Sequence, residues 1–403
     1  MSIYIKFAFK NLFRHTRRSL VSIGMIIGAF CSLYIFHGFA SDILQSLEEI
    51  SVNSMYGHIQ IAKPSYFDRT PLRLARDGYL TEVENLRAEI EKNPHVSSVA
   101  GRLSFFTLLS KGESSISARG IGFEVDKEEN IWSAMQIVKG AQLQPSSDRE
   151  ILIGQGLNGS MHANIGDNIT LVTSTLDGTV NAMDVTVRGI FNMGVAEIDD
   201  YVFFIPHKAA QRLLDADSFE QLIIQIKPDS SLQKVIQELQ PLADQHNLKV
   251  KSWRELSTLF NQVEDFWEMQ IRIVVYLLGI MIFLGIANTI SMSIIERTSE
   301  IGTLRALGFE KKDLMVIFLL ESLIMGLVGV GIAFPCAVLI STLLNMAQIP
   351  IVLPGSSVEF PFQILFTYSG LVQGAIVALV IPVLATLPAL RHILKKSIVD
   401  SLR

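Results

Sequence analysis

The chain has 403 residues, of which 49% are apolar and 18% are charged. This excess of apolar over charged residues is typical of a protein that lies partly in lipid. The net charge of −5 is unevenly distributed, because residues 1–19 contain five basic and no acidic residues, whereas residues 42–271 contain 20 basic and 32 acidic ones. The acidic bulk argues against a nucleic-acid-binding surface, so we expect no nucleic acid among the partners.

The N-terminal part predicts a basic amphipathic cytoplasmic helix over residues 1–19, followed by a first transmembrane helix over residues 20–41. A helix of roughly 20 apolar residues crosses about 30 Å of hydrocarbon. The run Leu20–Ala40 has an alternative as a signal peptide, because Gly38, Phe39 and Ala40 form a weak cleavage site. Its apolar core is longer than the roughly 7–15 residues of a signal sequence, so we expect the segment to be retained.

Three more apolar stretches predict transmembrane helices over residues 272–295, 314–344 and 364–388. The segment 296–313 and the tail 389–403 each contain several Lys and Arg, whereas the loop 345–363 contains none. Positive residues stay on the cytoplasmic side, so both ends and residues 296–313 are expected there. The chain is therefore predicted to be a multi-pass inner-membrane protein with residues 42–271 in the periplasm.

Residues 42–271 alternate between strand-like and helix-like patterns, separated by Gly and Asp turns. They predict an α/β domain made of two separated parts, at about 42–150 and 216–255, which hold a β-rich insert at about 151–215. The pattern from residue 254 to 271 is helical without Gly or Pro and runs into the second span. The second membrane helix is therefore expected to extend outward as an unbroken stalk.

The cytoplasmic segment after the second span reads Glu-Arg-Thr-Ser-Glu-Ile-Gly-Thr-Leu-Arg-Ala-Leu-Gly over residues 296–308. It resembles the ERTxEIGTLRALG signature of the FtsX-like permease family of ABC transporters, of the MacB type. The resemblance implies four transmembrane helices, a MacB-type periplasmic core domain, and a short coupling helix at 296–313 that docks on an ATPase subunit. The residues expected to carry this coupling are Glu296, Arg297, Glu300, Ile301, Leu304, Arg305, Ala306 and Leu307.

The pattern of this segment suits such a role independently. Ile301, Leu304 and Leu307 recur at helical spacing, and charged residues flank them, so an apolar stripe with a charged rim could enter a groove on a partner. An ordinary interfacial helix on the lipid surface is the alternative, and for an anonymous segment it would be favoured. The near-complete match to the signature reverses that preference.

Other segments also resemble the family. The runs 154–171 and 187–191 are similar to the Gly-x-x-Leu, Gly-Asp-x-Ile-x-Leu and Val-x-Gly-Ile-Phe pattern of the core domain, and residues 388–403 to its closing motif. In the first span, Gly24 and Gly28 form a Gly-x-x-x-Gly pair, which permits close helix approach and predicts a dimer contact. Glu321, near the cytoplasmic end of the third span, is expected to have a structural role.

The sequence contains no Gly-Lys dipeptide, no His-Glu-x-x-His and no clustered Cys/His spacing, so we expect no P-loop, no catalytic residues and no metal site. ATP and magnesium are expected to be bound by the partner ATPase. We predict a non-catalytic permease that passes ATP-driven movement to its periplasmic domain, for lipoprotein release or export of a hydrophobic substrate. Its partners would be an ABC ATPase, a second permease chain in a homo- or heterodimer, and membrane lipid.

Three alternatives remain open on the sequence. The chain could be a tripartite efflux permease that works with an adaptor protein and an outer-membrane channel, or an FtsX-like regulator of a cell-wall hydrolase that transports nothing. A membrane-bound sensor or enzyme is disfavoured because the motifs of such sites are missing.

Overall fold

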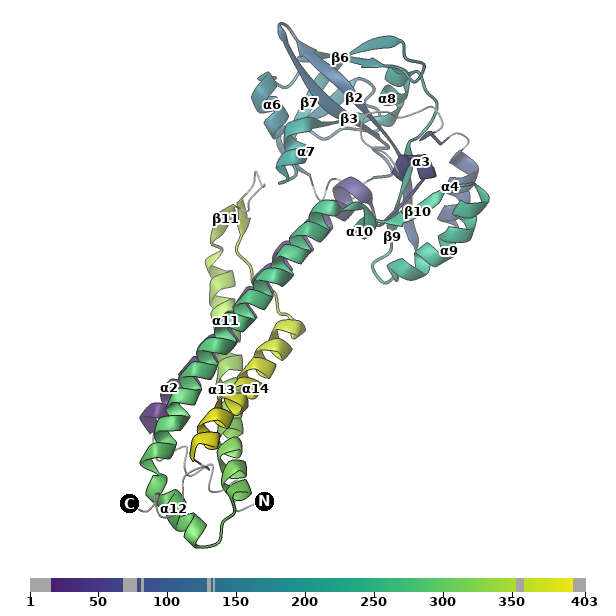
Figure 1. Cartoon of the computed structure of the whole chain (residues 1–403). Helices are drawn as coiled ribbons and strands as arrows, with labels where there is room; N and C mark the ends of the chain where they lie inside the picture. The colour runs from purple at the N-terminus through teal and green to yellow at the C-terminus, as the bar shows by residue number, and fades with distance from the viewer. Residues whose placement is uncertain are drawn as a thin grey trace. The chain divides into compact units, whose positions relative to one another are not determined.

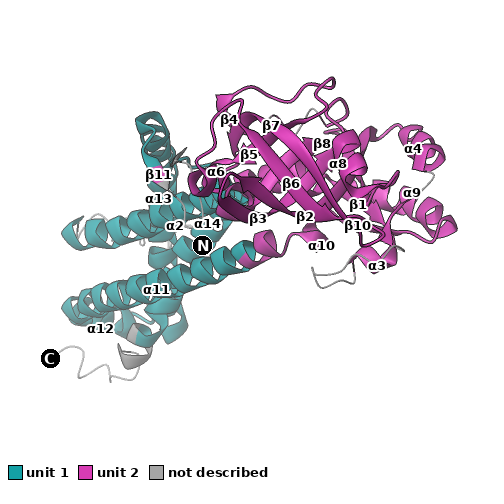
Figure 2. Cartoon of the chain, turned by 90° about the horizontal axis from the view of Figure 1, so that it is seen from above, with its two compact units in different colours: residues 1–44, 263–350, 361–403 teal, residues 45–262, 351–360 magenta. Residues whose placement is uncertain are grey.

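The structure is a computed structural model that describes residues 16–67, 78–80, 83–128, 132, 135–352 and 359–393. It divides into two compact units (Figure 2). We call residues 1–44, 263–350 and 361–403 the membrane unit, and residues 45–262 and 351–360 the core domain. Residues 1–15 of the predicted N-terminal helix and residues 394–403 of the predicted tail lie outside the described residues.

The membrane unit is built on four long helices, each with a stretch long and apolar enough to cross a membrane (Figure 1). The four predicted spans are thus confirmed, although the last helix begins at Tyr368 rather than at residue 364. A short helix connects the second and third of them, and a small hairpin precedes the fourth. The helices are α2 (Thr16–Ile50), α11 (Thr258–Glu296), α12 (Thr298–Ala306), α13 (Lys311–Ala347) and α14 (Tyr368–Ile393). The hairpin strands are β11 (Pro350–Val352) and β12 (Glu359–Pro361), and most of their residues belong to the core domain.

Branched apolar side chains fill the centre of this bundle, with Ile26 of α2 and Ile282 and Ile286 of α11 fully buried. Gly326 of α13 lies against α14 so closely that a Cβ there would be 2.8 Å from the carbonyl oxygen of Ala378. At the end of the bundle far from α12, Trp267 packs edge-on against Phe36 and Phe39. These aromatic contacts join α2 and α11 at that end of the bundle.

The core domain has two parts that share one strand. Its elements are η1 (Ser51–Tyr56), β1 (Ile59–Ala62), α3 (Pro64–Phe67), α4 (Val83–Glu91), β2 (Val96–Lys111), β3 (Ser114–Phe123), β4 (Gln136–Gly140), β5 (Glu150–Gly154), α6 (Gln155–Met161), β6 (Asn168–Ser174), β7 (Val180–Asn192), α7 (Ala196–Tyr201), β8 (Val202–Pro206), α8 (His207–Leu214), β9 (Gln221–Ile226), α9 (Leu232–Gln245), β10 (Lys249–Ser252) and α10 (Trp253–Leu256).

The first part is a split β-α-β lobe with strand order β10-β1-β9-β2. Neighbouring strands in it are antiparallel, and α4 and α9 each connect two strands that are not neighbours. Alternate residues of β1 and β9, such as Ile59, Ile61 and Leu222, form an apolar core with Leu86 of α4 and Leu239 of α9. One face of the sheet is therefore apolar and covered by helices.

The second part is a closed barrel. Strand β6 pairs with both β2 and β7, so the pairings β2–β3–β8–β5–β7–β6–β2 form a ring. Residues from all six strands fill its interior, among them Leu103, Ile153 and Phe203. The barrel includes β2 and β3, so the β-rich part begins near residue 102, earlier than the predicted 151. A long strand gives no sequence signal where it passes from one core to the next.

The two connections to the membrane helices reach neighbouring strands. Helix α2 continues into η1 and then β1, while β10 leads into α10 and then α11. Strands β1 and β10 are paired, with Ile59 opposite Ser252. The expected unbroken stalk is corrected: Ser257, with φ −84° and ψ 84°, separates α10 from α11, and the long helix begins at Thr258.

Candidate functional site

Residues 296–310, which we call the elbow, reverse the chain between α11 and α13. Arg297 leaves the helical conformation (φ −100°, ψ 15°), which ends α11 and begins α12 after a single residue. At the other end Gly308 adopts φ 99°, a conformation that favours glycine, and its N–H donates to the carbonyl of Arg305. A capping box between Glu310 and Asp313 then starts α13. The elbow therefore has a defined shape.

The two sides of α12 have different surroundings. Ile301 is 4% exposed in the core of the bundle, and Leu304 is half-buried against that core. Glu300, Ala306 and Leu307 are exposed, Leu307 to 75%, and Arg305 is half-buried. The interpretation of Ile301, Leu304 and Leu307 as one docking stripe is therefore corrected, because a short helix on the end of a bundle buries its apolar side against that bundle. Leu307 alone of the three faces outward.

Glu296, at the end of α11, is held by the first residues of α2. Both carboxylate oxygens accept hydrogen bonds from the guanidinium of Arg18, each at 2.6 Å. Both side chains are 37% exposed. The planar guanidinium matches the two oxygens, which fixes the direction as well as the length of the contact. The pair thereby joins two helices that are far apart in the sequence.

Arg297, the next residue, reaches α13 instead. Its Nη1 lies 3.6 Å from Oε2 of Glu321, and the two side chains are only 7% and 13% exposed. A small pocket of about 30 Å³ lies beside them, and Ser19, Ser293 and Ser322 are among its lining residues. Adjacent residues of the signature thus extend to different membrane helices.

The glycine pair of the first span lies on the open side of α2. A Cβ at Gly24 or Gly28 would meet no atom within 4 Å, and both residues are exposed. Leu20 and Val21, one turn earlier, are 65% and 61% exposed. The pair therefore makes no close contact within the described chain, and a dimer contact through it stays a prediction.

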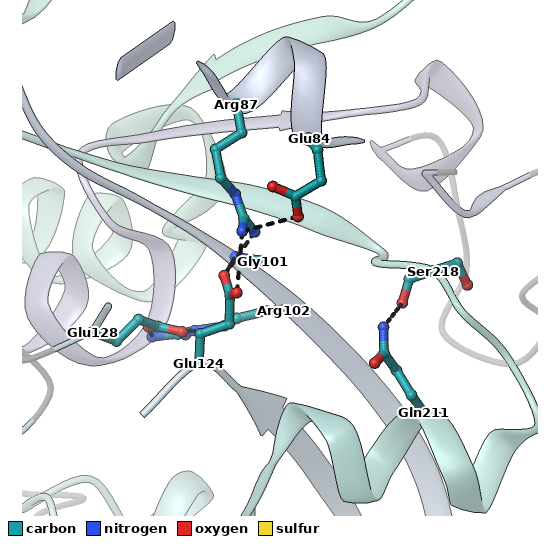
Figure 3. A network of polar contacts seen from close by, with 8 residues as sticks. All are labelled: Glu84, Arg87, Gly101, Arg102, Glu124, Glu128, Gln211 and Ser218. Atoms are coloured by element: carbon teal, nitrogen blue, oxygen red, sulfur yellow. Dashed lines mark hydrogen bonds and ion pairs between the residues drawn. The ribbon is translucent and has the colours of Figure 1, made fainter. Parts of the chain in front are cut away.

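A second charged cluster lies in the core domain, where β2 passes from the split lobe to the barrel (Figure 3). We call Arg87, Gly101, Arg102, Glu124 and Glu128 the seam. Arg87 of α4 donates two hydrogen bonds to Glu124, at 3.1 and 2.7 Å, and Glu124 also accepts from the backbone N–H of Gly101 at 2.7 Å. Arg102 donates to Glu128 through Nε at 2.8 Å. All four charged side chains are at most 7% exposed.

The same arginine caps η1, the segment of the core domain that continues from α2. Nη1 of Arg102 donates to the carbonyl of Met55 at 2.8 Å, and the side-chain amide of Gln225 donates to the carbonyl of Val52 at 3.2 Å. Both acceptors belong to η1, whose last carbonyls have no helical partner. Side chains of β2 and β9 therefore cap the helix that continues from α2.

Sequence reasoning missed Arg18 and Arg102 and gave Glu321 only a general structural role. A basic residue beside an apolar run is expected from membrane topology alone. The position of Arg18 therefore gave no reason to expect a specific partner for it. No group of three metal-ligating side chains occurs among the described residues.

Two sequence-family profiles match the chain. The MacB-like periplasmic core domain matches residues 19–242, and the FtsX-like permease C-terminal profile matches residues 272–398. The chain belongs to the FtsX-like permeases of MacB-type ABC transporters. The family resemblance predicted from residues 296–308 is thus confirmed, as is the fold class of four membrane helices with a large α/β domain.

Individual relatives agree with this family. The chain is 31% identical over 157 residues to "Macrolide export ATP-binding/permease protein MacB" of Haemophilus ducreyi, a match that covers 37% of this permease and 22% of that protein. It is 23% identical over 318 residues to the lipoprotein-releasing system transmembrane protein LolC of Neisseria meningitidis, covering 76% and 72%. The permease thus matches only about a fifth of the length of that MacB but most of that LolC.

A solved structure also aligns. The periplasmic region of MacB from Actinobacillus actinomycetemcomitans aligns with 55% of the chain and 98% of its own, at 11% identity and a TM-score of 0.37.

Proposed function

We propose that this permease is a subunit driven by a separate ABC ATPase, which binds ATP and magnesium and docks on the outward side of α12. The observation that carries the proposal is the placement of α12, whose inner side is anchored in the bundle by Ile301 while Leu307 is 75% exposed. A single exposed leucine is ordinary on a protein surface, so the assignment also rests on its place in the segment 296–308, which lies within the match to the FtsX-like permease profile. Glu300, Arg305 and Ala306 would complete the docking surface.

The connections in the core domain support transmission of this movement. Helices α2 and α11 lead to the paired strands β1 and β10, so displacement of either helix is applied to the same sheet edge. The caps on η1 fasten α2 to β2 and β9. Helix α11 continues without interruption from Thr258 to Glu296, and a continuous helix transmits displacement along its axis.

In the cell, the four helices would lie in the inner membrane, with α12 in the cytoplasm and the core domain in the periplasm, as the distribution of Lys and Arg predicts. A second permease chain would contact α2 at Gly24 and Gly28. The cargo class would be a lipoprotein or another hydrophobic molecule handled on the outer side of the membrane. An adaptor-linked efflux permease or a regulator of a cell-wall hydrolase would use the same transmission with a different periplasmic partner.

Substitution of Leu307 by Glu tests the docking surface. The substitution should abolish co-purification of the ATPase, because it places a charge in the apolar centre of the interface. Insertion and folding of the permease should be unchanged, since the side chain packs on nothing essential in its own bundle. The matched control is Val180→Glu in the core domain, where the replaced side chain is 76% exposed. Normal ATPase recovery with Leu307→Glu would return α12 to the role of a lipid-surface helix.

A further inference from the structure

The signature residues Glu296 and Arg297 do not lie on the outward side of α12. Glu296 is bound bidentately by Arg18 of α2, and Arg297 is 5% exposed and paired with Glu321 of α13. The remaining charged residues of the segment, Glu300 and Arg305, belong to α12 itself. The structure thus separates two kinds of charged residue within one continuous motif.

We propose that Arg18, Glu296, Arg297 and Glu321 form a charge clamp that transmits movement of α12 to α2 and α13. Within this clamp Glu296 and Arg297 are positioning residues, and they do not contact the ATPase. The clamp rests on the proposed function, because it takes α12 to be the element that the ATPase moves.

The need for the clamp follows from chain connectivity. Helix α12 follows α11 and precedes α13 directly, whereas the whole core domain separates α2 from the elbow in the chain. Apolar packing between helices gains little from the hydrophobic effect in lipid, because lipid tails are as apolar as the side chains. The bidentate contact between Arg18 and Glu296 adds a fixed geometry that resists rotation and sliding of α2 against α11. Helix α2 is also the helix that reaches η1, where Arg102 and Gln225 cap its end.

The pair on the other side suits a contact that must change geometry without breaking. Burial of Arg297 and Glu321 strengthens their attraction, because the surrounding dielectric constant is lower than that of water. Their separation of 3.6 Å is longer than an ordinary hydrogen bond. The adjoining pocket of about 30 Å³, with Ser293 among its lining residues, provides room for a shift of either side chain.

Reversal of the buried pair tests the clamp in the full chain complexed with its ATPase. We would compare Glu321→Arg, Arg297→Glu and the double variant, with Glu268→Arg as control, because Glu268 forms an exposed pair with Arg272 on α11. The first readout is ATPase co-purification. The second is the distance between two spin labels, measured with and without ATP and vanadate. The labels are attached to cysteines that replace Val180 and Leu327, whose side chains are 76% and 54% exposed. All labelled chains carry replacements of the two native cysteines, Cys31 and Cys336. They are mixed with an excess of unlabelled chain, so that the measured distance is the one within a single copy.

We expect the wild type and the Glu268→Arg control to show a nucleotide-dependent change in this distance. Each single reversal should retain the ATPase at the wild-type level but lose most of the change, and the double reversal should recover at least half of it. If a single variant fails to insert, Glu321→Gln replaces it, because this substitution removes the charge without adding bulk. It should lose the nucleotide-dependent change in distance while the ATPase remains bound.

Four results would overturn the clamp. Loss of the ATPase from Glu321→Arg without recovery in the double variant would assign the pair to docking. An undiminished distance change in the single variants, or no change in a wild-type complex that does bind its ATPase, would show that the pair transmits nothing. A wild-type chain that captures no ATPase would refute the proposed function, and the clamp would fall with it.

Discussion

The elbow and the seam both use arginine–glutamate pairs at a junction between packed elements, but they hold their partners differently. In the seam, Glu124 accepts two hydrogen bonds from Arg87 and a third from the backbone of Gly101. In the elbow, Arg297 and Glu321 are 3.6 Å apart beside a small cavity. The Glu124 carboxylate is thus held at three points, whereas the pair in the elbow is joined by one longer contact.

The difference suggests a division of mechanical roles. The seam fixes the split lobe to the barrel, so the core domain should respond to its membrane helices as one body. Under the proposed function the elbow accepts a moving partner, and a pair that is buried but loosely fitted permits this. On that proposal, buried charges provide a rigid joint in the core domain and an adjustable one in the membrane unit.

The largest effect is expected from Arg87→Leu in the seam. It leaves the Glu124 carboxylate buried without its cation, which typically costs about 3–5 kcal/mol. Thermal unfolding of the detergent-solubilised chain should show a corresponding fall in Tm. Arg212→Leu is the matched control, because Arg212 and Asp148 form a pair whose side chains are 49% and 61% exposed, and such pairs contribute about 0–1 kcal/mol. Equal losses for the two variants would show that the seam is not the rigid joint inferred here.

A smaller effect, on association alone, is expected when Gly24 and Gly28 are both replaced by Leu. The side chains enter open space in the single chain, so its unfolding temperature should be unchanged. If the glycines form the dimer contact, dimerisation should weaken at least about tenfold, or ~1.4 kcal/mol, because the helices can no longer approach closely. Dimer content in nanodiscs measures this. The control is Gly331→Leu, which also places a side chain in open space but on α13. An equal loss of dimer in this variant would refute the assignment of the dimer contact to Gly24 and Gly28.

The smallest expected effect is a pH dependence of core-domain stability. Burial lowers the pKa of His58 below its usual 6.5, and the hydrogen bond to Gln225 opposes this only in part. The unfolded chain therefore binds a proton more readily than the folded one, and stability should be full above pH 6.5 and decline as the pH falls through that value. Burial lowers the pKa of His207 too, although the negative charge of Glu124 opposes this shift. His207 should therefore also reduce the stability of the core domain as the pH falls.

Unfolding scans at pH 5.5 and 7.5 measure this decline. His58→Gln should reduce the difference between the two scans and leave the share that comes from His207. An unaltered difference in that variant would show that His58 does not carry it.

Local signals determined a large part of this protein. Hydropathy over some 20 residues is sufficient for a transmembrane helix, because each backbone polar group in lipid must bond within its own segment. The four spans therefore followed from composition and length. The alternating runs at residues 58–62, 169–173 and 221–227 predict strands, and β1, β6 and β9 begin and end within one residue of them, since alternation and turn residues act over short distances. The family followed from residues 296–308, and Gly308 ends the motif at the turn it requires.

Only the tertiary structure decided which partners these elements have. Closure of the barrel depends on β6 pairing with β2 as well as β7, and pairing between distant strands has no local signature. The inward side of α12 depends on the bundle that covers Ile301, so the stripe alone could not indicate which neighbour would bury it. Glu296 meets Arg18 across most of the chain, and charge pairing is set by where helices cross rather than by sequence spacing. The sequence thus determined the elements and the family, and long-range packing determined which charged residues of the motif face inward.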